Sequence, residues 1–75
     1  MSELVLYKKD ACPYCQKVFR FIEANSSEVT LRDIVKDPEA RAELLRVGGK
    51  AQVPCLFIDG KPLYESSDII AYLGK

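Results

Sequence analysis

The sequence predicts a small α/β fold in which helices cover both faces of a mixed four-stranded sheet. A short apolar run, an amphipathic helical pattern and a second apolar run form a β-α-β unit over residues 3–31. Such a unit requires a parallel strand pair joined by a right-handed crossover. A further apolar run precedes Asp59-Gly60, a turn signal that predicts an antiparallel hairpin with a returning strand after it. With a helical pattern before and after the hairpin, the expected order is β-α-β-α-β-β-α.

The first strand and helix follow from apolar spacing. An apolar run between charged residues predicts a buried strand over residues 3–7. Pro13 suits the first position of a helix, where the missing N–H leaves no bond unmade. One helix face is apolar at spacings i, i+3, i+4 and i+7, carried by Cys15, Val18, Phe19 and Ile22. The helix is expected to end at residues 25–27, and the alternation over residues 29–31 predicts the second strand.

The second helix has a clear start and stop. Asp37 is expected as its capping residue, with Pro38 at the first position. Its apolar face is predicted to consist of Ala40, Leu44 and Val47. Gly48-Gly49 ends the helical pattern.

The remaining elements surround the predicted hairpin. Residues 53–58 read as a third, apolar strand, and residues 61–64 read as the returning strand. Pro62 has no N–H to donate, which places that strand at the edge of the sheet. Ser66 or Ser67 is expected to cap a last helix, whose apolar residues are Ile69, Ile70 and Leu73.

Composition narrows the class of protein. The 75 residues predict one domain over residues 1–75, and the 11 basic and 11 acidic side chains balance to a net charge of +0. The chain has no excess of basic residues that would indicate binding to nucleic acid or to an anionic membrane surface. The first residues lack the pattern of a signal peptide, and the apolar runs are too short to span a bilayer. We therefore expect a cytoplasmic, monomeric protein with no nucleic-acid or membrane partner.

The segment Cys12-Pro13-Tyr14-Cys15 is the most informative part of the chain. It puts one cysteine at the start of a helix, where backbone N–H groups lack partners and the helix dipole is positive. Such a position stabilises a thiolate, which is the reactive form of cysteine. Lys9 lies three residues upstream and adds a positive charge. We assign Cys12 as the attacking thiolate and Cys15, on the apolar face, as the resolving thiol.

The cysteines also have other interpretations. A closed structural zinc site needs four ligands, whereas the chain has three cysteines and no histidine, so no metal is expected within one chain. A structural disulfide between Cys12 and Cys15 closes a small loop and stabilises little. Cys55, on a buried strand, is read first as a small core residue and second as a further redox sulfur.

Over nearly its whole length, the chain resembles a glutaredoxin. The resemblance rests on the C-P-Y-C motif, on Val53-Pro54 before the third strand and on the D-G turn after it. It implies a thioredoxin-like fold, glutathione as the reducing co-substrate, and reduction of protein disulfides and of glutathione mixed disulfides. It also implies a cis Pro54 facing the cysteine pair, with the backbone of Val53 pairing with the glutathione peptide.

The resemblance implies further ligand-binding residues. Lys9 matches a family lysine that attracts a glutathione carboxylate, and Tyr14 is the motif tyrosine that lines the groove. Arg41 falls where some members carry a basic residue for the glycyl carboxylate, and a solvated helix charge is its alternative reading. Ser66 and Ser67 begin the last helix, where the γ-glutamyl carboxylate is held.

One segment departs from the glutaredoxin pattern. Where that family usually carries Gly-Gly, this chain has Tyr64-Glu65, and the following E-S-x-x-I…Y-L pattern is similar to the glutathione-binding domain of glutathione transferases. Gln52 before Val53 also resembles that group. The combination implies a dithiol glutaredoxin with a transferase-like γ-glutamyl site formed by Glu65 and Ser66.

The sequence therefore predicts a thiol–disulfide oxidoreductase that uses glutathione. One alternative is a redoxin reduced by thioredoxin reductase, against which the carboxylate-binding residues argue. The other is a dimer that bridges an iron–sulfur cluster through Cys12 and glutathione.

Overall fold

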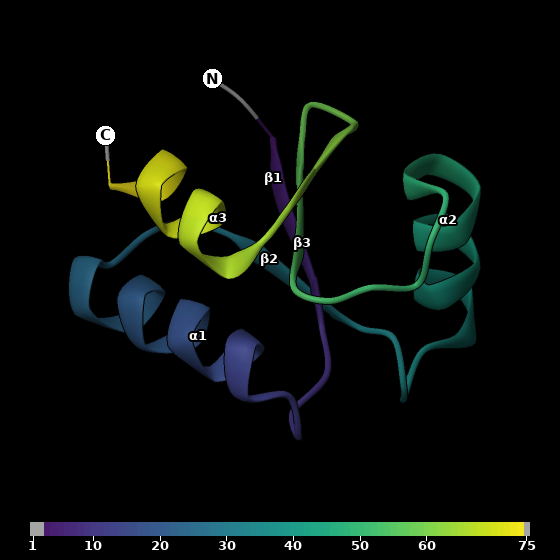
Figure 1. The fold of residues 1–75 in the computed structure, drawn as a ribbon, viewed down its shortest axis with the longest axis horizontal. Helices are drawn as coiled ribbons and strands as arrows, with labels where there is room; N and C mark the ends of the chain where they lie inside the picture. The colour runs from purple at the N-terminus through teal and green to yellow at the C-terminus, as the bar shows by residue number, and fades with distance from the viewer. Residues whose placement is uncertain (1–2, 75) are drawn as a thin grey trace.

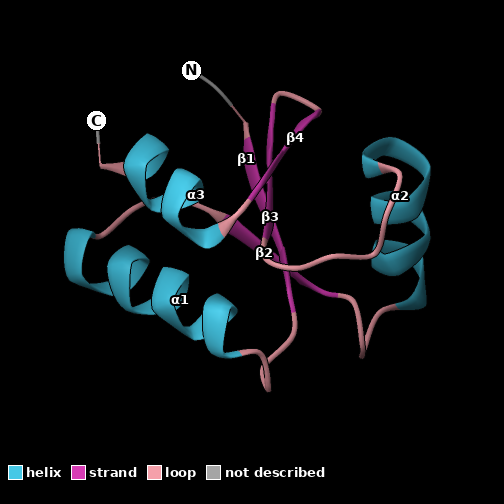
Figure 2. Ribbon diagram, viewed as in Figure 1, coloured by secondary structure: helices cyan, strands magenta, loops and turns pink. Residues whose placement is uncertain are grey.

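The computed structural model describes residues 3–74, and its elements follow the predicted order (Figures 1 and 2). The strands are β1 (Leu4–Lys8), β2 (Thr30–Asp33), β3 (Cys55–Ile58) and β4 (Lys61–Tyr64). The helices are α1 (Pro13–Asn25), α2 (Pro38–Gly48) and α3 (Ser66–Leu73).

The strands form one mixed sheet in the order β2-β1-β3-β4. β1 and β2 are parallel, as the β-α-β unit requires, while β3 runs antiparallel to both β1 and β4. Asp59 and Gly60 both have positive φ and form the turn between β3 and β4. β4 lies at an edge, so Pro62 leaves no bond of the sheet unmade. The predicted mixed sheet and hairpin are confirmed.

Helices cover both faces of the sheet. Figure 1 shows α1 and α3 side by side on one face and α2 on the other. The core under α1 and α3 is apolar and consists of Leu6, Val18, Leu56 and Ile69. The core under α2 consists of Tyr7, Ile34, Ala40, Leu44, Cys55 and Phe57. Because strand side chains alternate between faces, the neighbours Cys55 and Leu56 belong to different cores.

The structure corrects several predicted bounds. β3 begins at Cys55 instead of residue 53, since Pro54 has no N–H to donate to the sheet. β2 continues to Asp33, because β1 continues to Lys8 and the two residues are register partners. Val47 is 43% exposed, although Ala40 and Leu44 on the same face are buried. The helical pattern predicts the direction of the face, whereas the sheet beneath decides which of its residues are covered.

The start of α3 also differs from the prediction. The N-cap residue is Glu65, with φ 74° and ψ 120°, and its side chain makes no capping bond. The Ile69 N–H donates to the Glu65 carbonyl at 3.0 Å, so the helix begins directly after Glu65. Ser66 and Ser67 are therefore helical residues, and the expectation that one of them is the cap is wrong. The chain turns at Glu65 straight from β4 into the helix, which leaves no room for a serine cap.

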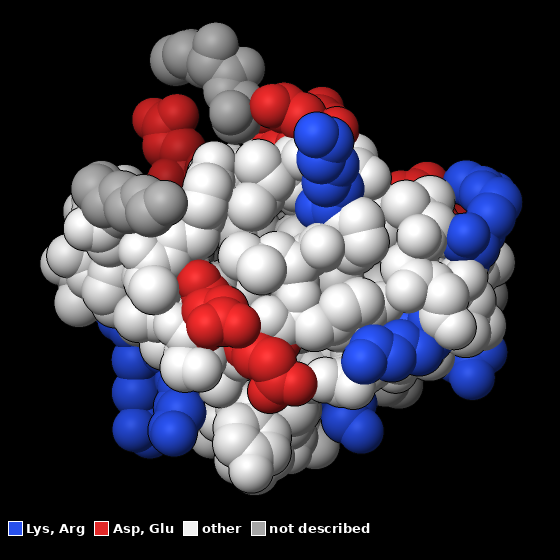
Figure 3. Space-filling model, turned by 45° about the horizontal axis from the view of Figure 1, so that its top comes forward, with Lys and Arg blue, Asp and Glu red and all other residues white. Residues whose placement is uncertain are grey.

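Charged side chains of both signs lie on the face of the molecule that Figure 3 shows. On the face shown in Figure 3, neither sign forms a continuous patch. Within residues 3–74, no helix is both long and apolar enough to cross a membrane.

Candidate redox site

Cys12 sits at the mouth of α1. It is the N-cap residue, with extended backbone at φ −84° and ψ 119°, and Pro13 occupies the first helical position. The Cys12 carbonyl accepts the Gln16 N–H at 3.1 Å, which begins the helical bonding pattern. The thiol therefore faces the backbone N–H groups of the first turn, which have no partners within the helix. Cys12 is buried, with only 7% of its surface exposed.

The pKa of Cys12 lies below its ordinary value of 9.0. Burial alone would raise this pKa, because a thiolate loses hydration in the protein. Hydrogen bonds from the backbone N–H and the thiol of Cys15 oppose burial, and a bond from the Tyr14 N–H adds to them. The Lys9 charge contributes in the same direction. The first turn thus offers several donors to one sulfur and stabilises its thiolate.

Cys15 has the opposite character. It is fully buried, and burial raises its pKa to about 11. Donation to a Cys12 thiolate, and the charge of that thiolate, raise the pKa of Cys15 further. A neutral Cys15 thiol therefore stands beside an ionisable Cys12, and both cysteines are reduced.

The segment before β3 lies against the cysteine pair. The Val53-Pro54 peptide bond is cis, as the family resemblance implied. The Cys12 thiol lies 3.9 Å from the Val53 carbonyl oxygen and donates to it. Residues 41 positions apart in the chain thus meet at the Cys12 sulfur.

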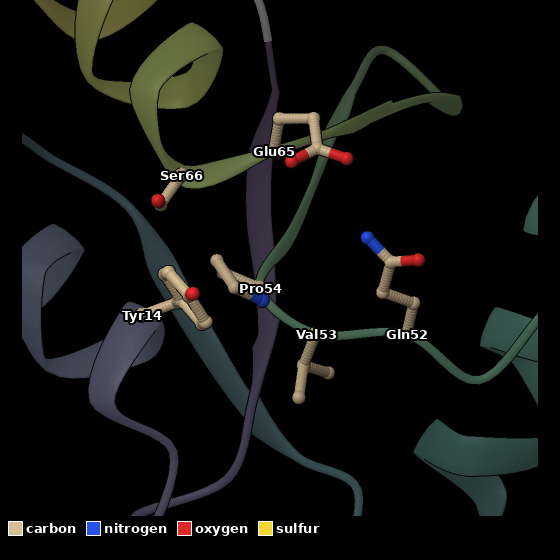
Figure 4. Close-up of a pocket in the computed structure, with 6 residues that line it drawn as sticks. All are labelled: Tyr14, Gln52, Val53, Pro54, Glu65 and Ser66. Carbon is tan, nitrogen blue, oxygen red and sulfur yellow. The ribbon is translucent and has the colours of Figure 1, made fainter.

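A pocket of about 400 Å³ lies at this place (Figure 4). It is walled by one residue of α1, by the segment before β3 and by the start of α3. In Figure 4, the Tyr14 ring lies on one side, and the Gln52 and Glu65 side chains lie across the opening. The lining residues are Tyr14, Gln52, Val53, Pro54, Glu65 and Ser66. All six belong to the ligand-binding residues that the sequence predicted.

Three predicted ligand-binding residues lie outside the lining of this pocket. Lys9 lines a separate hollow of about 200 Å³, beside Asp10 and Lys36. Arg41 and Ser67 are exposed, on α2 and α3 respectively. The structure brings Lys9 close enough to act on the Cys12 charge, but it places neither Arg41 nor Ser67 at the pocket.

Cys55 is the third thiol. It is fully buried in the core under α2, and burial raises its pKa to about 11. This environment agrees with the first reading, a small core residue. Among the described residues 3–74, no group of three or more histidine, cysteine or acidic side chains is arranged to hold a metal ion.

One residue beside the pocket carried no signal in the sequence. Tyr64 ends β4, and its hydroxyl donates to the Lys50 carbonyl at 3.0 Å. Neither apolar spacing nor a motif marks this contact, because it joins the end of β4 to a loop 14 residues earlier.

Comparison with known proteins supplies the family context. The glutaredoxin family model matches residues 4–63. A curated relative, glutaredoxin 3 of Escherichia coli strain K12, is 29% identical over 73 residues, which are 95% of this chain and 86% of the relative.

Solved structures extend the comparison. The thioredoxin-like protein BC3987 matches with a TM-score of 0.81 and 26% identity, over 95% of this chain and 99% of its own. Glutathione transferase Omega 3C of Trametes versicolor matches at TM-score 0.80 and 27% identity, over 93% of this chain and 31% of its own. A buckwheat glutaredoxin–glutathione complex, at TM-score 0.74 and 23% identity, shares the fold over 93% of this chain and 66% of its own.

Proposed function

The chain belongs to the glutaredoxin family, whose members are thiol–disulfide oxidoreductases, and we propose that it reduces disulfides with glutathione as its reducing co-substrate. One observation carries the proposal. A thiol with a lowered pKa stands 3.9 Å from the Val53 carbonyl, at a pocket walled by Tyr14 and Glu65.

The first step uses Cys12 as the nucleophile. Its thiolate attacks one sulfur of a substrate disulfide, a Cys12–substrate bond forms, and the other substrate sulfur leaves as a thiolate. When the substrate is a glutathionylated protein, Cys12 takes the glutathione and the protein thiolate leaves. A lowered pKa also makes Cys12 a good leaving group, which speeds the following step.

Two routes release the bound partner. With a protein disulfide, Cys15 loses its proton and attacks Cys12, which forms a Cys12–Cys15 disulfide and frees the reduced substrate. Two glutathione molecules then restore the dithiol and become one molecule of oxidised glutathione. With a glutathione adduct, a second glutathione attacks the mixed disulfide directly. Because Cys15 is neutral at physiological pH, its attack requires proton removal in the mixed disulfide.

The pocket supplies groups for each end of glutathione. The Val53 backbone suits strand-like pairing with the peptide, and Tyr14 lines the groove. The first N–H groups of α3 suit a carboxylate, and the Glu65 side chain suits an ammonium group, so this end is proposed to take the γ-glutamyl moiety. Lys9, Arg41 and Ser67 remain proposals for charge attraction from outside the pocket lining.

Mass mapping after incubation with oxidised glutathione tests the proposal. The Cys15→Ser variant is used so that the adduct cannot resolve within the chain. We expect one glutathione adduct, on Cys12, in this variant and none in Cys12→Ser. An adduct confined to Cys55, or no adduct at all, contradicts the proposal.

A further inference from the structure

Tyr64 joins two walls of the pocket. Its hydroxyl donates to the Lys50 carbonyl at 3.0 Å, and the Lys50 ammonium lies 4.5 Å from the centre of the Tyr64 ring. Lys50 lies two residues before Gln52, and Tyr64 lies directly before Glu65. One side chain therefore connects the loop that carries Gln52 and Val53 to the segment that carries Glu65 and Ser66.

The end of α2 is shaped around this tyrosine. Gly48 lies against the Tyr64 hydroxyl so closely that a methyl group at position 48 would overlap it. The φ of Gly48 lies outside the left-handed region, so an alanine there meets no backbone strain, only this overlap. The ring of Tyr64 also packs against the core under α2, which sets its direction. The hydroxyl thus points at the loop and lies against Gly48 at the end of α2.

The loop between α2 and β3 has a further attachment at its other end. There the Val53 carbonyl accepts the Cys12 thiol. That bond weakens as Cys12 ionises or forms a mixed disulfide, because the thiol then loses its proton. The Tyr64–Lys50 bond does not depend on the state of Cys12.

We propose that Tyr64 is a positioning residue that holds the loop carrying Gln52 and Val53 at a set distance from Glu65 and Ser66, and thereby sets glutathione affinity. The inference rests on the proposed function for its ligand. It assigns Tyr64 no contact with the reacting sulfurs, so the intrinsic reactivity of Cys12 is independent of it.

Tyr64→Phe removes the hydroxyl and keeps the ring. We expect faster amide hydrogen exchange at Ala51, Gln52 and Val53 in the free protein, because one anchor of the loop is lost. We expect the KM for glutathione to rise about two- to tenfold, the range for one net hydrogen bond, with kcat within twofold. The pH profile of Cys12 alkylation should not move. Lys50→Gln keeps the backbone acceptor and removes only the charge over the ring, so it should raise loop exchange less than Tyr64→Phe does.

Gly48→Ala provides an independent test. Its methyl group must displace the Tyr64 hydroxyl, so it should raise both loop exchange and KM. In the Tyr64→Phe background the same change should add much less, because the overlapping oxygen is absent. Circular dichroism confirms that each variant is folded.

The outcomes separate the two proposals. Unchanged loop exchange in Tyr64→Phe overturns the positioning role whether or not glutathione is the co-substrate. Faster exchange with unchanged KM overturns the link to glutathione affinity. If the effects of Gly48→Ala and Tyr64→Phe on loop exchange and KM are additive, the contact between position 48 and the Tyr64 hydroxyl is not their cause. Failure of the Cys15→Ser variant to form an adduct on Cys12 overturns the proposed function alone, because loop exchange is measured without glutathione and still tests the role of Tyr64.

Discussion

Two regions of this molecule hold buried thiols, the mouth of α1 and the core under α2. Cys12 and Cys15 are 7% and 0% exposed, and Cys55 is 0% exposed. The pKa of Cys12 is nevertheless lowered, while those of Cys15 and Cys55 are raised to about 11. Burial alone therefore does not decide which sulfur is reactive.

The difference lies in the balance between burial and hydrogen-bond donors. Around Cys12, the backbone N–H groups of Tyr14 and Cys15 point at the sulfur, because the first turn of a helix leaves them unpaired. Burial has the largest effect on the pKa of Cys55, and the bonds from the Tyr64 hydroxyl and the Leu63 N–H do not offset it. A thiol in the sheet core therefore stays neutral, whereas the N-cap position of a helix supports a thiolate.

The largest expected difference in turnover is between replacing Cys12 and replacing Cys55. Cys12→Ser should lower turnover of a glutathione mixed disulfide by at least about a thousandfold, the scale of losing a nucleophile. Cys55→Ala should keep turnover within twofold at 25 °C. A coupled assay of oxidised glutathione release measures both. High activity in Cys12→Ser would refute the assignment of the nucleophile.

Removal of Cys15 should affect one class of substrate. Cys15→Ser should spare reduction of glutathione mixed disulfides and slow reduction of a protein disulfide by about a hundredfold, because intramolecular attack has a high effective concentration. Insulin reduction and a glutathionylated peptide provide the two assays. Equal losses on both substrates would contradict a purely resolving role.

The pH dependence of alkylation should order the three sulfurs. In the reduced protein, iodoacetamide should modify Cys12 with a midpoint below the ordinary thiol pKa of 9.0. Cys15 and Cys55 should stay unmodified until the pH approaches about 11. Peptide mapping across a pH series distinguishes them. A shared midpoint for Cys12 and Cys15 would remove the electrostatic basis of the comparison.

Stability should fall in alkaline solution. Between pH 9 and about 11, the unfolded chain has released the Cys15 and Cys55 protons while the folded chain still holds them, so the free energy of unfolding decreases as pH rises. Tyr7, with its pKa raised to about 12, extends the decrease upward. Cys12 acts in the opposite direction, since its folded pKa is depressed. Thermal melts under reducing conditions measure the trend, which Cys55→Ala should lessen.

The smallest expected effect belongs to Lys9. Its charge is the least of the contributions that lower the pKa of Cys12, and the side chain is exposed. Lys9→Met should therefore raise the alkylation midpoint of Cys12 by less than about one pH unit, and added salt should shrink the difference. A larger shift would mean that charge, and not the helix start, dominates at Cys12.

Much of the architecture was predictable from local patterns. Apolar spacing located most elements of residues 3–74, Pro13 marked the start of the first helix, and Asp59-Gly60 marked the hairpin and its returning strand. The placement of Cys12 ahead of a helix already predicted the direction of its pKa shift. These features depend on residues within a few positions of one another, so the sequence carries them directly.

Contacts between distant segments needed the folded chain. Only the sheet order brings Val53 to Cys12 and sets Glu65 and Ser66 across from Tyr14. Arg41 and Ser67 lie outside the pocket lining, and Glu65, instead of a serine, is the cap of α3. The sequence by itself determined the elements and the cysteine that we propose as the nucleophile. The tertiary structure decided which side chains share a pocket, because residues far apart in the chain meet only through strand pairing and packing.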